Sequence, residues 1–251
     1  TYAGYSRVLD EHPSEYDKIF NDLTIKVTSF FRDEVAFKAL EEIVLPELIK
    51  RRIKKNKSLR IWSAGCATGE EPYSIAMLLH QMLGKRISPE NNLYLLATDI
   101  DTHALGCAKE GIFPKEGVEA IRSALRRRYF VSLSGSYRIK TSIRRLVNFK
   151  EHNLVNGPPY EDLDLIVCRN VLIYFSASLQ MRVLRGFYDG LRRGGFLLLG
   201  KAEVPTGTGE ADVLFECVDK KAKLFKKAIH RKYREEELGP AKRRMWLNVR
   251  W

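Results

Sequence analysis

The stretch from residue 59 to residue 79 restricts the fold of this chain more than any other part of it. The mainly apolar run over 59–62 predicts a buried strand, and residues 63–69 then carry no bulky side chain. Small residues let the backbone turn sharply and approach a ligand closely. Pro72 stands in the first turn of a predicted helix, where proline is tolerated. This order of strand, glycine loop and helix is typical of nucleotide-binding α/β sheets.

The glycine loop does not have the sequence of a phosphate site. It lacks the Gly-Lys-Ser/Thr ending of a phosphate-binding loop, and two carboxylates, Glu70 and Glu71, stand at the start of the helix instead. Negative charge there repels a phosphate and suits a ligand with cationic and hydroxyl groups, such as S-adenosylmethionine. Considered alone, the two glutamates are better explained by the helix dipole, and only the sequence downstream favours a ligand site.

Composition indicates a globular chain with a positive surface. The chain has 251 residues, 45% of them hydrophobic and 29% charged, which is enough for one medium α/β domain with a small appendage. Its net charge of +12 fits a nucleic-acid partner, an acidic protein surface or an anionic membrane face. The basic residues are dispersed or lie near connections, so solvated positive faces explain most of this charge.

The four cysteines, at positions 66, 107, 168 and 217, are widely spaced and form no Cys-x-x-Cys pair. The sequence therefore predicts neither a metal site nor a disulfide framework. There is no signal peptide and no apolar run of membrane length, so we expect a cytoplasmic protein without membrane insertion.

Three regions are expected along the chain. Residues 1–50 form a helical N-terminal region, which we expect to be truncated because the chain begins with Thr. Residues 58–229 form the α/β domain, in which a strand-like segment at about 129–147 is a small antiparallel β-subdomain. Residues 230–251 form a charged tail.

The hydrophobic pattern predicts alternating strands and helices. The predicted strands are 59–62, 91–98, a short one from 147, 163–168 and 196–199, followed by a closing hairpin of 213–218 and 222–226. The predicted helices are 34–50, 70–83, 102–110, 112–128 and 179–191. The Gly-Pro-Pro-Tyr sequence at 157–160 is expected in a loop, because it precedes a strand instead of following one.

Two acids and one arginine are further candidates for a ligand site or a helix cap. Asp99 ends the second predicted strand, the place of the acid that accepts the ribose hydroxyls in nucleotide-binding folds. Asp101 is expected to cap helix 102–110, and without the glycine loop a capping role for both acids would be equally acceptable. Arg32 follows two phenylalanines of the predicted core and can grip a carboxylate with its planar guanidinium.

Four motifs carry a resemblance to a known family. They are Thr28-x-Phe-Phe-Arg32, Ser63-Ala-x-x-x-Thr-Gly-Glu70-Glu-Pro-Tyr-Ser, Ala97-x-Asp99-Ile-Asp and Cys168-Arg-Asn170-Val-x-Ile-Tyr-Phe, in that order. From about residue 10 to about residue 227 the chain resembles the chemotaxis receptor glutamate methyltransferases of the CheR type. The resemblance implies a Rossmann-like, S-adenosylmethionine-dependent methyltransferase fold with a small antiparallel β-subdomain and a short helical N-terminal region.

The resemblance also implies roles for individual residues. Arg32 would grip the carboxylate of S-adenosylmethionine and is the candidate catalytic residue, Glu70 would hold the methionine moiety, and Asp99 the ribose. The full set of implied cofactor-binding residues is Thr28, Arg32, Gly65, Glu70, Asp99, Asn153, Leu154, Asn170 and Val171. Asn153 and Leu154 would flank the adenine. The family often has Asn where Lys26 stands, so no contact is assigned to that side chain.

The partners implied by the resemblance are proteins. The acceptor would be glutamate carboxylates in the cytoplasmic helical region of methyl-accepting chemotaxis receptors, with S-adenosylhomocysteine as product and a monomeric enzyme. Some members also bind a receptor pentapeptide through the β-subdomain. Because the loop between Phe130 and Tyr137 is short here, our hypothesis is that this chain needs no pentapeptide tether.

An ionised carboxylate is already a nucleophile, so we expect no catalytic triad, no strong general base and no metal. Two alternatives remain open. The net charge of +12 would suit a nucleic-acid methyltransferase, but Arg169-Asn170-Val171 is not an amino-methylation motif. A non-catalytic module that senses S-adenosylmethionine would bind the cofactor and transfer nothing.

Overall fold

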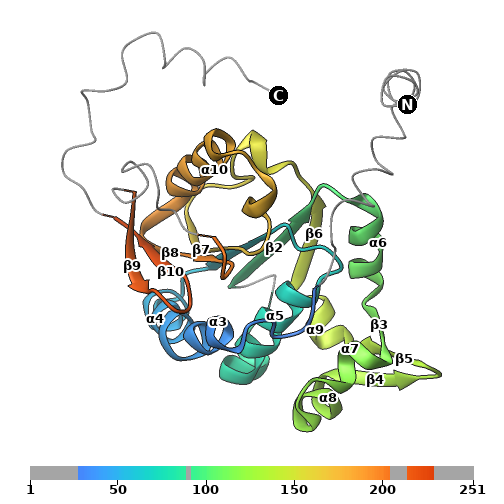
Figure 1. Ribbon diagram of the computed structural model, residues 1–251. Coiled ribbons are helices and arrows are strands. Elements are labelled where there is room, and N and C mark those ends of the chain that lie inside the picture. Colours follow the sequence, from blue (N-terminus) through green and yellow to red (C-terminus); the bar gives the residue numbers. More distant parts are fainter. Residues whose placement is uncertain (1–27, 89–91, 204–213, 229–251) are drawn as a thin grey trace, which may run out of the picture.

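The computed structural model describes residues 28–88, 92–203 and 214–228 (Figure 1). Seven strands form the main sheet, in the order β6-β2-β1-β7-β8-β10-β9. Their bounds are β1 Leu59–Ala64, β2 Leu93–Asp99, β6 Val147–Glu151, β7 Leu163–Cys168, β8 Leu191–Leu199, β9 Phe215–Asp219 and β10 Leu224–Lys227. The predicted α/β class with a Rossmann-like sheet is confirmed.

The sheet is built around β1. Five neighbouring strands run parallel, and the predicted closing hairpin, β9 with β10, adds antiparallel to β8. Ile61 of β1 pairs with Leu95 of β2 on one side and with Leu165 of β7 on the other. The strand order reverses between β1 and β7, and open α/β sheets bind ligands outside the carboxyl ends of the strands at such a point.

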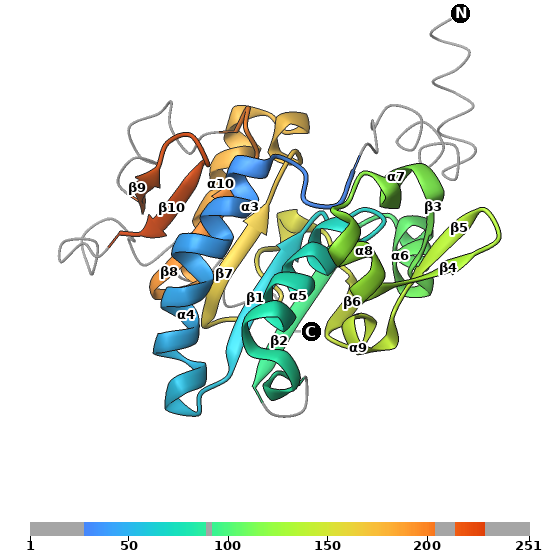
Figure 2. The same cartoon turned by 90° about the horizontal axis from the view of Figure 1, so that it is seen from below.

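Helices cover both faces of the sheet (Figures 1 and 2). Helices α3, α4 and α5 lie on one face, and α10 lies on the opposite face. The helices are α3 Glu34–Ala39, α4 Leu45–Arg51, α5 Glu70–Leu83, α6 Thr102–Glu110, α7 Lys115–Glu119, α8 Ser123–Tyr129, α9 Thr141–Arg144 and α10 Ala177–Gly190, with 3₁₀ turns at 53–55, 84–86, 154–156 and 172–174.

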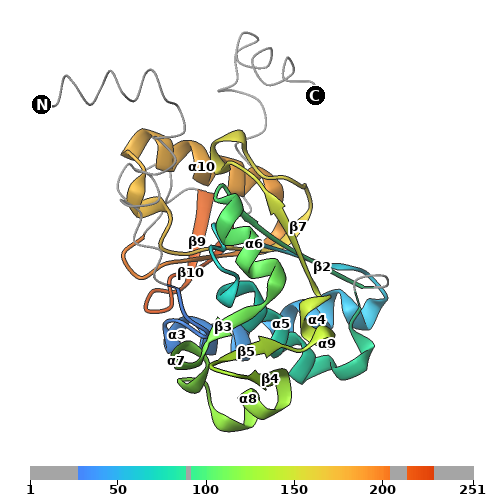
Figure 3. The same cartoon turned by 90° about the vertical axis from the view of Figure 1, so that its right-hand side faces the viewer.

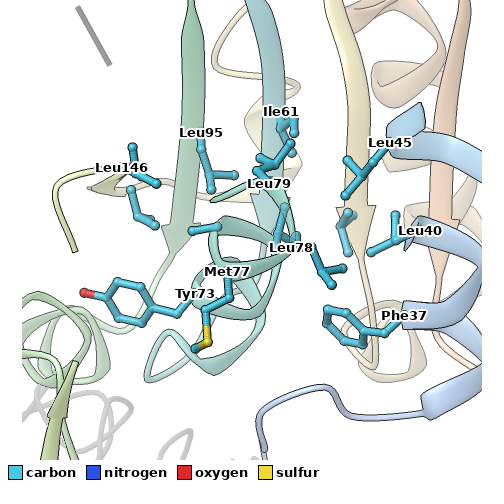
Figure 4. Close-up of a cluster of buried hydrophobic side chains, with 14 of the residues drawn as sticks. Phe37, Leu40, Leu45, Ile61, Tyr73, Met77, Leu78, Leu79, Leu95 and Leu146 are labelled. Carbon is cyan, nitrogen blue, oxygen red and sulfur yellow. The ribbon is translucent and has the colours of Figure 1, made fainter. Parts of the chain in front are cut away.

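The larger hydrophobic core lies between the sheet and the helices α3, α4 and α5 (Figure 4). Ile61 and Leu95 of the sheet face Leu79 of α5, and Phe37 and Leu40 extend the cluster beneath β7. Burial of one such side chain stabilises the fold by about 1.5–3 kcal/mol. Residues 71–79 of α5 are buried without interruption. The helix that starts at the glycine loop is therefore held on every side.

The predicted helix 34–50 is interrupted. A π-helical turn, Leu40–Val44, separates α3 from α4, and Pro46 stands in the first turn of α4. Proline has no N–H to donate and its ring displaces the carbonyl of the preceding turn, which is a physical reason for the change in hydrogen bonding. The apolar face predicted from the sequence still reaches the core, since Phe37, Leu40 and Leu48 are buried.

The β-subdomain starts earlier than predicted. Strands β3 Ile112–Pro114, β4 Phe130–Leu133 and β5 Ser136–Ile139 form a separate antiparallel sheet, beside the short helices α7 and α8 (Figure 3). The prediction of a helix over 112–128 was wrong at its start and in its middle, because β3 pairs with β5 and the chain turns between α7 and α8. The strand-like pattern over 129–147 was wrong at 141–144, which form α9. Neither pairing partner nor tertiary packing is visible in the local pattern.

The predicted break after helix 179–191 does not exist. Helix α10 runs directly into β8 at Leu191, although the sequence predicts a strand only from Phe196. The glycines at 194 and 195 lie within the strand, where the register between β7 and β8 shifts. The predicted helical segment before residue 23, part of the hairpin and the tail at 230–251 lie outside the described residues.

Candidate functional site

A cavity of about 540 Å³ opens at the carboxyl ends of β1, β2, β6 and β7. A volume of this size is usual for sites that bind small molecules or cofactors. The side chains around it come from five segments: Thr28, Ser29 and Arg32; Gly65, Ala67 and Glu71; Asp99, Ile100, Asp101 and Ala104; His152 to Val155; and Arg169 to Val171 with Ile173, Tyr174 and Phe175. All the predicted site residues except Glu70 are therefore brought together.

Gly65 lets the glycine loop approach the loop that follows β7. Its φ of +76° is unfavourable for other residues, and a Cβ at this position would lie 2.4 Å from Cγ2 of Val171. Both residues line the cavity. A side chain at position 65 would therefore push Val171 away and change the shape of the cavity.

Asp99 and Asp101 have different tasks. Asp101 caps α6, because its Oδ1 accepts hydrogen bonds from the backbone N–H of His103 at 2.9 Å and of Ala104 at 3.1 Å, so the predicted cap is confirmed. Asp99 is not a cap of that kind. Its Oδ2 accepts from the N–H of Ala67 at 2.8 Å, and its Oδ1 accepts from the N–H of Asp101. Asp99 thus fixes the glycine loop while it faces the cavity.

A buried ion-pair network that the sequence analysis missed forms one wall. The guanidinium of Arg169, whose side chain is 2% exposed, contacts Oδ2 of Asp33 at 2.5 Å and Oε2 of Glu71 at 3.3 Å. It also lies over the ring of Phe37. The hydroxyl of Ser63 donates to Oε1 of Glu71 at 2.9 Å. Since an isolated buried charge costs several kcal/mol, this mutual pairing is what makes the burial tolerable.

The two adjacent glutamates of α5 point to different places. Glu71 lines the cavity, and burial raises its pKa, although Arg169 acts in the opposite direction. Glu70 is absent from the cavity lining, and its Oε2 accepts from the hydroxyl of Thr68 at 2.6 Å. Burial also raises the pKa of Glu70. Of the two, Glu71 is the residue placed to meet a ligand.

The segment before α3 contributes to the cavity lining. The backbone N–H of Phe31 donates to the hydroxyl of Ser74 at 3.0 Å, which ties the segment to α5. Phe30 is buried, as predicted, with its ring edge-on to Phe113 and Phe130 of the β-subdomain. These two anchors bring Thr28 and Arg32 to the cavity.

The opposite end of the cavity is formed after β6. Oδ1 of Asn153 accepts from the N–H of Val155 at 3.0 Å, and Nε2 of His152 donates to the carbonyl of Gly157 at 2.7 Å. Burial lowers the pKa of His152, which favours the neutral ring. Leu154 is buried and belongs to the second hydrophobic cluster, beneath α10. This end is therefore largely apolar, with polar groups already engaged by the backbone.

The loop after β7 presents an unusual backbone. Asn170 has φ of +61°, and its Oδ1 is buried without a hydrogen-bond partner in the described part of the chain. Asn170 lines the cavity, but this oxygen is inaccessible to solvent and is not itself open to a ligand. Ile173 and Tyr174, each about half exposed, stand at the mouth of the cavity.

Within the described ranges no group of three or more His, Cys, Asp or Glu side chains could hold a metal ion. The same residues include no helix long and apolar enough to cross a membrane. All four cysteines are free, and burial raises the thiol pKa of Cys66 and Cys168, which keeps both protonated.

Comparison with known proteins decides the family. Residues 26–223 match the model of the CheR methyltransferase, SAM binding domain. The chain belongs to the CheR methyltransferase family. It is therefore an S-adenosylmethionine-dependent methyltransferase, and the family, enzyme class and cofactor expected from the four motifs are confirmed.

Curated relatives agree with this assignment. The chain is 37% identical to chemotaxis protein methyltransferase 2 of Pseudomonas aeruginosa over 209 residues, 81% of this chain and 72% of that protein. It is 36% identical to the chemotaxis protein methyltransferase of Listeria monocytogenes over 203 residues, 81% of this chain and 74% of that protein. It also matches an uncharacterised 104.1 kDa protein of Rhodobacter capsulatus at 36% identity, over 80% of this chain but only 21% of that protein. CheR-type sequences thus also occur within much longer chains.

Proposed function

We propose that this CheR-family chain transfers the methyl group of S-adenosylmethionine to glutamate side-chain carboxylates in the cytoplasmic helical region of chemotaxis receptors. The products are glutamate methyl esters and S-adenosylhomocysteine. The observation that carries the proposal is the cavity at the β1 and β7 switch point, whose wall combines Glu71, Asp99, Arg32 and Asn170. The names of the Pseudomonas and Listeria relatives support chemotaxis as the setting.

The cavity fits the cofactor in size and in charge. A volume of about 540 Å³ suits a nucleoside joined to an amino acid. The acids suit an ammonium, a sulfonium and a ribose diol, and none of these three groups needs a phosphate-binding loop. Asn170 and Val171, which line the cavity, would lie beside the amino-acid part. The residues present thus match the cofactor in kind.

We assign the cofactor-binding roles as the family resemblance suggests, with one change. Arg32 would pair with the methionine carboxylate, and Asp99 would accept the ribose hydroxyls. We assign the methionine ammonium to Glu71 instead of Glu70, because only Glu71 faces the cavity. The remaining contacts are Thr28, Gly65, Asn153, Leu154, Asn170 and Val171.

The chemistry needs little from the protein beyond position. When bound, the cofactor supplies a methyl group activated by its sulfonium. The acceptor carboxylate, with an ordinary pKa of about 4.3, is ionised at neutral pH and needs no general base. The enzyme must hold the acceptor oxygen in line with the methyl group and exclude water. Arg32 would hold the cofactor's carboxylate end in place for this alignment, while Tyr174 and Ile173 at the mouth would cover the acceptor.

The proposed partners follow from the family resemblance. We propose a cytoplasmic monomer that acts on receptors and not on nucleic acid. We also propose that it needs no pentapeptide tether. The tight turn between β4 and β5, with Gly135 at φ of +76°, supports that last proposal because it leaves no long loop beside the small sheet.

Methyl transfer from labelled S-adenosylmethionine tests the proposal. Receptor-containing membranes should acquire label that mild base releases as methanol, which identifies a carboxyl methyl ester. Matched membranes whose receptor carries alanine at the methylated glutamates should stay unlabelled. Transfer to RNA or DNA instead would support the nucleic-acid alternative. Tight cofactor binding with no transfer to any acceptor would favour a sensing module.

A further inference from the structure

Glu203 lies just after β8, outside the lining of the cavity, and is only 4% exposed. Its carboxylate accepts four backbone N–H groups. Oε1 accepts from Val171 at 2.8 Å and Leu172 at 2.7 Å, and Oε2 accepts from Asn170 at 3.0 Å and Gly200 at 2.6 Å. Three of the four donors belong to the loop that follows β7.

That loop supplies the wall where the cofactor's amino-acid end is assigned. Asn170 is held at φ of +61°, a conformation that costs energy for a residue with a side chain. Val171 contacts the glycine loop at Gly65. Such a backbone persists only where its surroundings fix it, and Glu203 engages three successive N–H groups there. The position of Asn170 and Val171 in the cavity wall therefore depends on a side chain that does not line the cavity.

The donors also explain why the residue is an acid. An ionised carboxylate only accepts, and its two oxygens offer about four lone-pair sites for the four N–H groups. A glutamine in the same place would turn an NH₂ group toward N–H donors. Shortening the side chain to aspartate would withdraw both oxygens from the loop.

We propose that Glu203 is a positioning residue for cofactor binding, which acts by holding Asn170 and Val171 in their cavity-forming conformation. Gly200 belongs to the same arrangement. A Cβ at Gly200 would lie 2.6 Å from both the Asn170 nitrogen and Oε2 of Glu203, so no larger residue fits. The inference rests on the cofactor site, not on which acceptor is methylated.

The test compares Glu203→Gln with Asp164→Asn by calorimetric titration with S-adenosylhomocysteine and by thermal melting. Asp164 is the matched control, because it is fully buried, accepts the backbone N–H of Arg60 at 2.9 Å and lies at the opposite ends of the strands. We expect Glu203→Gln to weaken binding about 10- to 100-fold, as displacement of site groups by about 1 Å does. Asp164→Asn should lower the melting temperature while its dissociation constant stays within about twofold of wild type.

Two further variants keep the test decisive if Glu203→Gln does not fold. Gly200→Ala disturbs the same loop and should weaken binding in the same direction. A double-mutant cycle combines Glu203→Gln with Asn170→Ala. The double variant should lose no more affinity than the weaker-binding single variant, because both changes act on the same contact. Binding by Glu203→Gln or Gly200→Ala within about twofold of wild type would overturn the proposal, as would equal losses in Asp164→Asn. These titrations measure cofactor binding and not receptor methylation. The role of Glu203 can therefore be confirmed or overturned even if the proposed acceptor is wrong.

Discussion

The two ends of the parallel strands both bury charged side chains, but only one of them encloses a cavity. At the carboxyl ends, Glu71 and Arg169 pair beside the cavity. At the amino ends, Asp164 lies 3.0 Å from Nε of Arg192 and 3.5 Å from Nε of Arg52. Burial raises the carboxyl pKa of both Glu71 and Asp164.

The difference lies in what else the charged groups contact. Around Asp164 the arginines donate to backbone carbonyls, such as Arg192 to Asp162 and Arg60 to Glu161. At the other end Glu71 and Arg169 line the cavity, which Asp164 does not. A buried charge or a raised pKa is therefore no sign of a site by itself. A buried oxygen without a hydrogen-bond partner does not distinguish the two ends either, because Oδ1 of Asp164 and Oδ1 of Asn170 both lack one in the described part of the chain. The cavity is what separates the site from a structural network.

The largest expected effect comes from Gly65→Ala. The new Cβ must displace Val171 and strain a backbone at φ of +76°, so we expect the affinity for S-adenosylhomocysteine to fall more than about 100-fold. Gly84→Ala is the matched control, since Gly84 has φ of +58° but nothing within 4 Å of its Cβ position. It should cost about 1–3 kcal/mol of stability through backbone strain, without a change in the cavity. Calorimetry would contradict the assignment if both variants bound equally well.

Next in size is the loss of Arg169. Arg169→Met leaves Glu71 buried without its cation and removes the partner of the one-third exposed Asp33, which should cost about 3 kcal/mol of unfolding free energy and weaken cofactor binding. Arg192→Met at the other end leaves Asp164 with Arg52 and the Arg60 N–H, so we expect a smaller loss and no change in affinity. Urea unfolding and calorimetry on both variants measure this contrast. Equal losses of affinity would erase the distinction between the two ends.

A smaller effect concerns pH. The folded-state pKa of Glu71 lies above its unfolded value, so its protonated form stabilises the fold at low pH and this contribution is lost as the pH rises through the folded pKa. The affinity for a cationic ligand depends on pH in the opposite sense, because only the ionised carboxylate attracts the cation. Affinity for S-adenosylmethionine should rise with pH until Glu71 is ionised, and Glu71→Gln should remove this dependence. Asp164→Asn should retain it, although Asp164 also has a raised pKa. Titrations with S-adenosylmethionine from pH 5 to about pH 8 measure this slope. A slope that persists in Glu71→Gln would contradict the prediction.

The smallest effect is expected for Arg51→Met at the amino ends. Nη1 of Arg51 donates to the carbonyl of Gly194 at 2.9 Å, and Nη2 donates to that of Arg193. Both contacts are at least partly exposed, so we expect a loss of about 1 kcal/mol in thermal or urea unfolding. Cofactor affinity and methyl transfer should be unchanged. A marked loss of affinity would mean that the two ends are coupled through β8.

Much of the parallel sheet could be predicted from the sequence because β1, β2, β7 and the second half of β8 are mainly apolar runs. The glycine loop, Asp99 and the loop after β7 follow from the same pattern. What could not be predicted depends on orientation or distance. Neighbouring helix positions differ by about 100° in direction, so Glu70 and Glu71 cannot be distinguished without the fold. Glu203 stands in a Gly-Lys-Ala-Glu sequence of no special pattern, and its four donors come mostly from residues over 30 positions away. The strand β3 is too short for its own signal.

The contact between Asp33 and Arg169 joins residues 136 positions apart in the chain. During synthesis at about 5–20 residues per second, Asp33 waits roughly 7–27 s before Arg169 has been added. Through that interval α5 can already form, yet Glu71 at its start lacks the cation that accompanies it in the finished fold. The wall of the cofactor cavity therefore cannot be completed before β7 has been made, and the Glu203 contacts to the loop after β7 form later still. Cofactor binding by a nascent chain would then report that synthesis has passed Glu203, not merely that a helix has formed.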